Sequence, residues 1–169
     1  VIGTPLHYLP LDAHRRILGD QHARKARSVL SDVDVSFDLI HSHLTWTAGY
    51  VGSVLQSELD VPHVLTVHEN PDLLESEVES DRRKLLDTWA SADAVVRVNR
   101  GDQPVLRQFN EDVEYIPNGF SPETFHPIPR EEAKEALRLP TDRPFLFALG
   151  HLKERKGFQH LIEVLPAVV

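Results

Sequence analysis

Two stretches near the end of the chain decide its fold, residues 115–127 (YIPNGFSPETFHP) and residues 145–157 (FLFALGHLKERKG). The first predicts a strand that stops at an Asn-Gly turn and runs into a proline-marked connector. The second predicts a buried strand, then a loop with one glycine and several cations, and then a helix. A strand, a basic loop and a helix N-terminus, in this order, suit the binding of a diphosphate.

Along the rest of the chain, short apolar segments alternate with longer segments of helical spacing. Upstream strands are expected at residues 37–43, 61–68, 94–98 and 113–116. Helices are expected at residues 12–30, 46–59, 71–90, 103–109, 130–137 and 157–169. Strands that alternate with helices predict an α/β fold, with a Rossmann-like parallel sheet that helices cover on both faces.

The expected domain organisation follows from the connector. Residues 118–137 are predicted to form an interdomain linker and a short helix. Residues 1–117 would then be the later part of one Rossmann-like domain. Residues 138–169 would be only the first strand–helix unit of a second domain, and one such unit cannot bury its own faces. The chain begins with Val1 and contains no Met, so we expect a fragment that is incomplete at both ends.

Composition excludes several classes of protein. A net charge of −8 disfavours a general nucleic-acid role, because phosphate backbones are bound by basic surfaces. The absence of cysteine excludes disulfides, cysteine-zinc sites and a cysteine nucleophile. No apolar run approaches the ~20 residues that cross a bilayer, and no signal peptide is visible, so a cytoplasmic setting is expected. No basic amphipathic helix supports contact with a membrane.

The loop before the last helix is the first candidate site. Gly150 ends the predicted strand and allows close backbone approach, and His151, Arg155 and Lys156 follow within six residues. Helix N-termini carry free N–H groups and a partial positive charge, both of which favour a phosphate. The alternative interpretation is a solvated basic turn, which is the usual role of a charge run.

Histidines at two strand ends form the second candidate site. His41 and His43 are two residues apart on a strand and therefore point to one face, and His68 ends the next strand. Three histidines suggest a metal site or a hydrolase, but no carboxylate follows at a typical ligand spacing. The alternative is structural, with His41 buried and hydrogen-bonded and His43 near the strand end.

Taken in order, these motifs resemble the family 4 glycosyltransferases. The resemblance runs from about residue 37 onward and is sharpest after Tyr115. It implies the GT-B architecture, two Rossmann-like domains that face each other across a cleft, and a role in carbohydrate biosynthesis. It also implies transfer of a sugar from a nucleotide diphosphate sugar to a sugar, lipid or small-molecule acceptor, with retention at the anomeric carbon. Neither a cofactor nor a metal is expected.

The resemblance also implies roles for particular residues. Lys156 matches a family lysine that holds the donor diphosphate, with Gly150 and Arg155 beside it. His151 stands where the family has an arginine, and a neutral His stabilises a leaving diphosphate less well. His68, at the end of a Thr-x-His strand, matches a histidine close to the transferred sugar and is the candidate catalytic residue.

Weaker candidates line the predicted cleft: His43, Asn118 and Gly119. The role expected of His43 and His68 is hydrogen bonding to hydroxyl groups rather than covalent catalysis. For the Asn-Gly pair we expect a mainly conformational role at the domain crossing.

The family's Gly-rich loop would lie before Val1, and its pair of glutamates eight positions apart would lie after Val169, so the fragment alone is predicted to be inactive. Three alternatives stay open. One is another enzyme on this architecture, such as a sugar-nucleotide epimerase or a phosphorylase. The second is a truncated or non-catalytic nucleotide-sugar-binding protein, and the third is a metal hydrolase built on the histidines.

Overall fold

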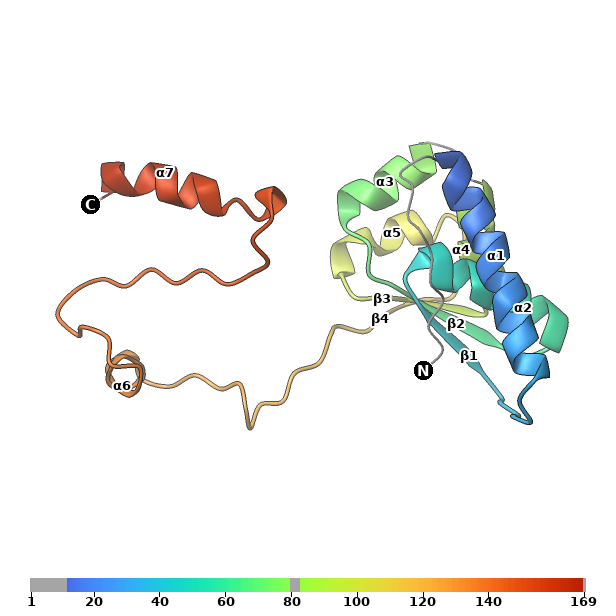
Figure 1. Cartoon of the computed structure of the whole chain (residues 1–169), viewed down its shortest axis with the longest axis horizontal. Coiled ribbons are helices and arrows are strands. Elements are labelled where there is room, and N and C mark those ends of the chain that lie inside the picture. The colour runs from blue at the N-terminus through green and yellow to red at the C-terminus, as the bar shows by residue number, and fades with distance from the viewer. Residues whose placement is uncertain (1–11, 80–82, 169) are drawn as a thin grey trace. The chain divides into compact units, whose positions relative to one another are not determined.

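A computed structural model describes residues 12–79 and 83–168 of the chain, and residues 1–11, 80–82 and 169 lie outside the described part. The chain divides into two compact units, unit 1 (Val1–Gly119) and unit 2 (Phe120–Val169). Figure 1 labels the elements of both.

The described part of unit 1 is built on a sheet of four parallel strands, β1 (Ile40–His43), β2 (His63–Val67), β3 (Ala94–Arg97) and β4 (Val113–Tyr115). They lie in chain order, β1-β2-β3-β4, and every neighbouring pair is parallel. One buried row crosses all four strands through Ser42, Leu65, Val95 and Val113. The expected α/β parallel sheet is confirmed.

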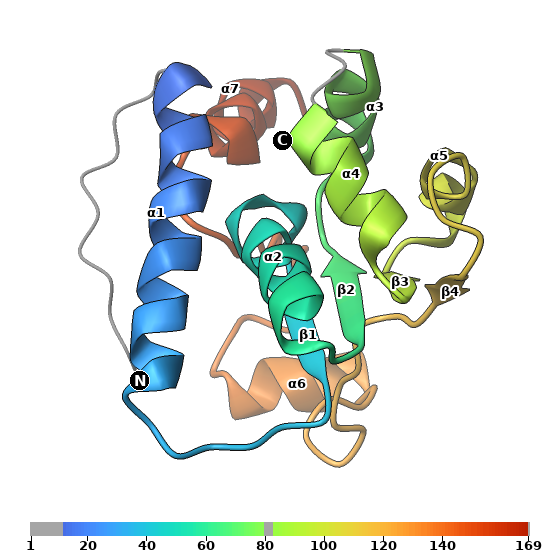
Figure 2. The same ribbon diagram turned by 90° about the vertical axis from the view of Figure 1, so that its right-hand side faces the viewer.

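The helices of unit 1 gather on one face of that sheet. Helix α1 (Asp12–Ser31) packs on α2 (Tyr50–Leu59), and α2 packs on α4 (Arg83–Ser91), so that α2 and α4 lie in front of the sheet in Figure 2. Crossovers between parallel strands are right-handed, so strands laid down in chain order return every crossover to the same side. Our expectation of helices on both faces is wrong for the described residues.

Because one face carries no described helix of unit 1, burial alternates along the strands, except at Thr66, which is buried on the open face. Leu65 and Val95 are fully buried beneath the helices, whereas Val64 and Val96 on the opposite face are half-buried and His41 is exposed. A period of two in burial is what a sheet covered on a single face produces.

The core joins the covered face of the sheet to the helices. Its centre includes Leu65, Val67, Leu74, Trp89, Val95 and Leu106, all fully buried. Each large apolar side chain buried in this way contributes ~1.5–3 kcal/mol relative to an exposed one. The indole Nε1 of Trp89 donates a hydrogen bond of 2.8 Å to Thr45 Oγ1, so the polar atom of this buried side chain has a partner.

The helix expected over residues 71–90 is instead two helices in the described residues, α3 (Pro71–Glu79) and α4, whose axes differ in Figure 2. Both insert apolar residues into the same core, Leu74 from α3 and Trp89 from α4. Helical spacing is a local signal and cannot report a change of axis between two segments that obey it separately.

Shorter elements complete unit 1. A helical turn, η1 (Thr45–Gly49), follows β1, and η2 (Arg100–Asp102) with α5 (Gln103–Leu106) follows β3.

Among the described residues, none of the helices is long and apolar enough to span a bilayer.

Unit 2 contains α6 (Arg130–Ala136), η3 (Glu154–Lys156) and α7 (Phe158–Val168), and no strand is assigned within its described residues. The buried strand predicted at residues 145–149 is therefore absent. Phe147 and Leu149 are 75% and 87% exposed there. A strand needs a neighbour to accept and donate its ladder hydrogen bonds, and unit 2 supplies no such neighbour among its described residues.

The Asn-Gly turn expected after β4 is also absent. Asn118 and Gly119 lie in an irregular exposed segment, and neither has a positive φ. An Asn-Gly pair favours a tight turn when a second strand returns beside the first. Here no strand returns beside β4, which is the last described strand of unit 1.

Candidate functional site

The carboxyl ends of β1 and β2 bring two of the predicted histidines into contact. The register pairs His43 with Thr66, and His68 follows two residues later, just past the end of β2. His43 Nδ1 lies 2.9 Å from His68 Nε2, within hydrogen-bond distance, and the two rings stack with centroids 5.2 Å apart. One nitrogen donates and the other accepts, so the pair holds a single proton between these two atoms.

His41 lies beside this pair on the same face of the sheet. Its Nε2 is 2.8 Å from Thr66 Oγ1, and its ring centroid is 4.4 Å from that of His43. Although His41 is exposed as a whole, partial desolvation of its ring lowers its pKa, and the neighbouring charges of protonated His43 and His68 lower that pKa further. The hydrogen bond agrees with the structural alternative, but the expected burial is wrong because no described helix of unit 1 covers this face.

The loop after β1 is held in place by a residue that we did not assign. Glu69 Oε1 accepts a hydrogen bond of 2.6 Å from the backbone N–H of Thr45. Leu44 N donates to Thr66 O at 2.9 Å, and Leu44 adopts a φ of 72°, which is uncommon for a residue with a side chain. Glu69 directly follows His68, so this hydrogen bond connects the loop after β1 to the segment that carries His68. The spacing of residues along the sequence does not predict such a contact.

The predicted diphosphate loop belongs to unit 2. Gly157 has a φ of +69° and precedes α7, as expected for the glycine before the last helix. His151 and Lys156 are exposed, and Lys156 N donates to Lys153 O at 2.9 Å within the turn. A Cβ placed on Gly150 would lie 3.4 Å from the ring of Phe158, so the loop packs closely on the first residue of α7. The Arg155 side chain lies outside the described atoms.

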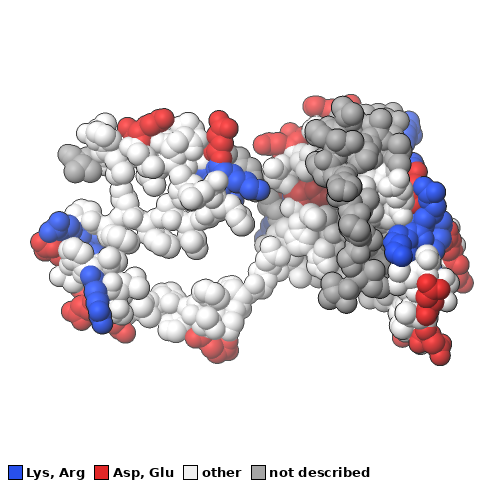
Figure 3. Space-filling model, in the orientation of Figure 1, with Lys and Arg blue, Asp and Glu red and all other residues white. Residues whose placement is uncertain are grey.

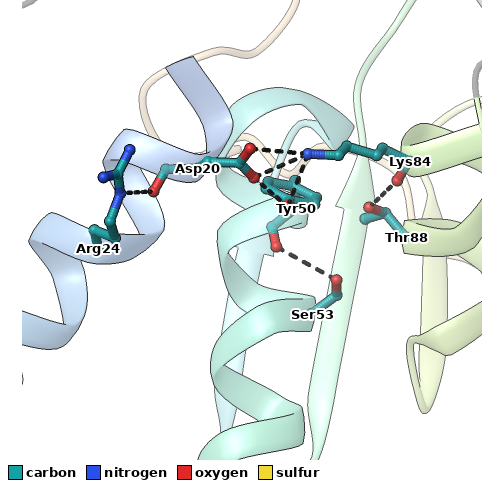
Figure 4. Close-up of polar contacts among 6 residues, drawn as sticks. All are labelled: Asp20, Arg24, Tyr50, Ser53, Lys84 and Thr88. Atoms are coloured by element: carbon teal, nitrogen blue, oxygen red, sulfur yellow. Dashed lines mark hydrogen bonds and ion pairs between the residues drawn. The ribbon is translucent and has the colours of Figure 1, made fainter. Parts of the chain in front are cut away.

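A hollow of about 350 Å³ lies between α1 and α2, lined by residues other than the histidines. At its end, Tyr50 OH donates to Asp20 Oδ1 at 2.6 Å, and Lys84 Nζ lies 2.9 Å from the same carboxylate oxygen (Figure 4). The three side chains come from α1, α2 and α4 and connect these helices. Basic side chains gather along α1 in Figure 3, where Arg24, Lys25 and Arg27 are exposed.

Within residues 12–79 and 83–168, no group of three His, Cys, Asp or Glu side chains is arranged to hold a metal ion. His43 and His68 use the nitrogens that face each other for their own hydrogen bond. The pair is thereby placed to hydrogen-bond, within itself and with a hydroxyl group of a ligand.

Comparison with known proteins identifies the family of the chain. Residues 1–124 match the family described as Glycosyltransferase Family 4. The "Alpha-maltose-1-phosphate synthase" of Mycolicibacterium smegmatis is 29% identical over 139 residues, covering 73% of this chain and 36% of that protein. The "Putative teichuronic acid biosynthesis glycosyltransferase TuaC" of Bacillus subtilis is 26% identical over 158 residues, covering 87% and 40%.

A third relative, the "D-inositol 3-phosphate glycosyltransferase" of Saccharomonospora viridis, is 28% identical over 145 residues, which cover 79% of this chain and 33% of that protein. The chain thus spans between 33% and 40% of the length of these three relatives.

Proposed function

The chain belongs to Glycosyltransferase Family 4, and from that premise we propose that it is part of an enzyme that moves a sugar from a nucleotide diphosphate sugar to an acceptor hydroxyl, with retention at the anomeric carbon. The observation that carries the proposal is the contact between His43 and His68 at the carboxyl ends of β1 and β2. In open α/β sheets, ligands bind outside these strand ends.

The histidine pair suits recognition of a sugar. Each ring engages one nitrogen in the shared hydrogen bond, and the other two nitrogens, Nε2 of His43 and Nδ1 of His68, make no hydrogen bond to a described residue and could bind a substrate. A neutral imidazole nitrogen either donates to or accepts from a hydroxyl group. We propose that His68 hydrogen-bonds the transferred sugar through Nδ1. His43, through its hydrogen bond to Nε2, sets the tautomer of His68.

The loop from Gly150 to Gly157 suits the leaving group. When the bond between the anomeric carbon and the diphosphate oxygen breaks, the electron pair stays on the diphosphate. The acceptor oxygen forms the new bond to the anomeric carbon on the same face, and its proton leaves with the diphosphate. Positive groups aimed at such developing charge lower the barrier. Lys156 precedes the N-terminus of α7, a helix of 11 residues, and both supply positive potential. We propose that this loop acts without a metal, with His151 in a supporting role.

The proposal is tested on the full-length protein that carries this chain. UDP-, GDP- and ADP-sugars are offered with a panel of sugar and sugar-phosphate acceptors, and the product's anomeric configuration is read by NMR. Lys156→Ala is expected to lower turnover about 100-fold, because one donor to a developing oxyanion contributes that much. His68→Ala is expected to cost about tenfold, the value of one hydrogen bond of ~1.4 kcal/mol.

Matched controls are Lys25→Ala and His126→Ala, which remove an exposed cation and an exposed histidine elsewhere in the chain. Both should retain full turnover. An inverted product, or unchanged turnover in both Lys156→Ala and His68→Ala, would contradict the proposal. Donor binding without transfer would favour a binding module.

A further inference from the structure

A buried arginine lies one strand away from the histidine pair. Arg97, on β3, is 1% exposed. Its Nη1 donates a hydrogen bond of 2.9 Å to the backbone carbonyl of Val67, and its Nη2 lies 2.5 Å from Asp102 Oδ2 in η2. Arg97 therefore connects the end of β2, its own strand and the turn after β3.

Burial of a guanidinium group is costly, and its pairing with one carboxylate recovers only part of that cost. Among the residues that the structure describes, Arg97 Nε also has no hydrogen-bond partner. Position 97 belongs to the helix-covered face of the sheet, where Val95 packs as an ordinary apolar residue. An apolar residue at position 97 would suit the stability of the core at least as well. The hydrogen bond from Arg97 to the Val67 carbonyl therefore points to a reason other than core stability.

The reason lies in the residue that follows. The Val67 carbonyl is half of the peptide that joins Val67 to His68, and peptide groups are planar. A donor that fixes this carbonyl also fixes the plane from which His68 continues. On the other side of His68, Glu69 binds the N–H of Thr45. His68 is held between an anchor from β3 and an anchor from the β1 loop.

We propose that Arg97, supported by Asp102, is a positioning residue for His68: it orients the backbone from which the His68 ring meets His43. The functional half of this inference rests on the proposed sugar transfer, whereas the geometric half does not. Arg97 itself touches no substrate, so its loss acts through the orientation of His68.

The experiment uses the full-length protein and four variants, Arg97→Met, Arg97→Lys, Asp102→Asn and Arg107→Met. The last is the control, because Arg107 also donates to a strand carbonyl, that of Val113 at 3.0 Å, but on β4. The first readout is the ring ¹⁵N spectrum of His68, assigned with His68→Gln. The second is the separation of kcat from KM for the donor.

In the wild type, the His68 ring nitrogens should carry the signature of a histidine-to-histidine hydrogen bond. Arg97→Met should abolish it and lower kcat about tenfold while the donor KM stays within twofold, since one hydrogen bond is at stake. Arg97→Lys should retain part of the hydrogen-bond signature and part of kcat. Arg107→Met should change neither the His68 spectrum nor kcat.

An unchanged His68 spectrum in Arg97→Met overturns the inference. Should that variant fail to fold, the near-isosteric Asp102→Asn decides: an unaltered His68 spectrum there also overturns it. If the wild type has no transferase activity, the proposed function fails, and the spectra still decide whether Arg97 positions His68.

Discussion

Asn110 offers the sharpest test of how unit 1 is held together. It lies between α5 and β4 and is 8% exposed. Its Nδ2 donates to the carbonyls of Trp89 and Ala92 at 2.8 and 2.7 Å, and its Oδ1 accepts from Asp112 N at 2.8 Å. One amide group thereby joins the end of α4 to the start of β4. Asn110→Asp keeps the shape and replaces the double donor with a second acceptor.

The cost follows from the two carbonyls that would lose their donor. A buried polar group left without a partner costs ~1–3 kcal/mol, so two of them cost about 2–6 kcal/mol. That is a large part of the 5–15 kcal/mol typical of a domain. Asn110→Ala loses all three hydrogen bonds without placing a charge beside the carbonyls, and it should be the less destabilised of the two variants.

The destabilisation by Asn110→Asp should depend on pH. The new carboxyl faces two carbonyl oxygens, and only its protonated form can donate to one of them. Its folded pKa is therefore raised above the unfolded value of about 3.9. The native state then binds the extra proton, so the free energy of unfolding of Asn110→Asp falls as pH rises from that value to the folded pKa.

Urea unfolding followed by tryptophan fluorescence measures this effect, because Trp89 is fully buried and its carbonyl is one of the two partners. The comparison is made at pH 4 and pH 7 against the wild type. The reasoning is refuted if Asn110→Asp is within ~0.5 kcal/mol of the wild type at pH 7, since ordinary surface substitutions fall in that range. It is also refuted if the difference in the free energy of unfolding between Asn110→Asp and the wild type is not smaller at pH 4 than at pH 7.

Two further predictions concern the helix layer. Hydrogen bonds from Tyr50 and Lys84 lower the pKa of Asp20, so this stabilisation is present above about pH 3.8 and lost as pH falls through the lowered pKa. Because both ion-pair side chains are nearly half exposed, Asp20→Asn should cost less than ~1 kcal/mol in urea and should flatten the acid limb of the stability curve. Gly52→Ala would drive a methyl group into the hydrogen-bonded His63 and Ser42 side chains and should cost ~1–3 kcal/mol in thermal or urea unfolding, whereas little change would show that α2 can move outward.

Much of unit 1 could be predicted because its signals are local. The apolar run at residues 61–68 and the helical spacing at residues 12–30 correspond to β2 and to α1. Motif order along the chain also indicated the family that the comparison confirms. Of the candidate site residues, His43 and His68 could be placed at strand ends, because the ends of parallel strands collect at one edge of a sheet.

Contacts between distant segments decided the rest. Three hydrogen bonds near the candidate site join residues that are 24 to 30 positions apart in the sequence. They connect His43 with His68, Thr45 with Glu69, and Arg97 with Val67. The failure at residues 145–149 has the same origin, because an apolar run becomes a strand only where a neighbour completes its ladder. Residue spacing determines which segments favour helix or strand and which faces are apolar, whereas pairing partners, the covered face of the sheet and the orientation of His68 arise only when the chain folds.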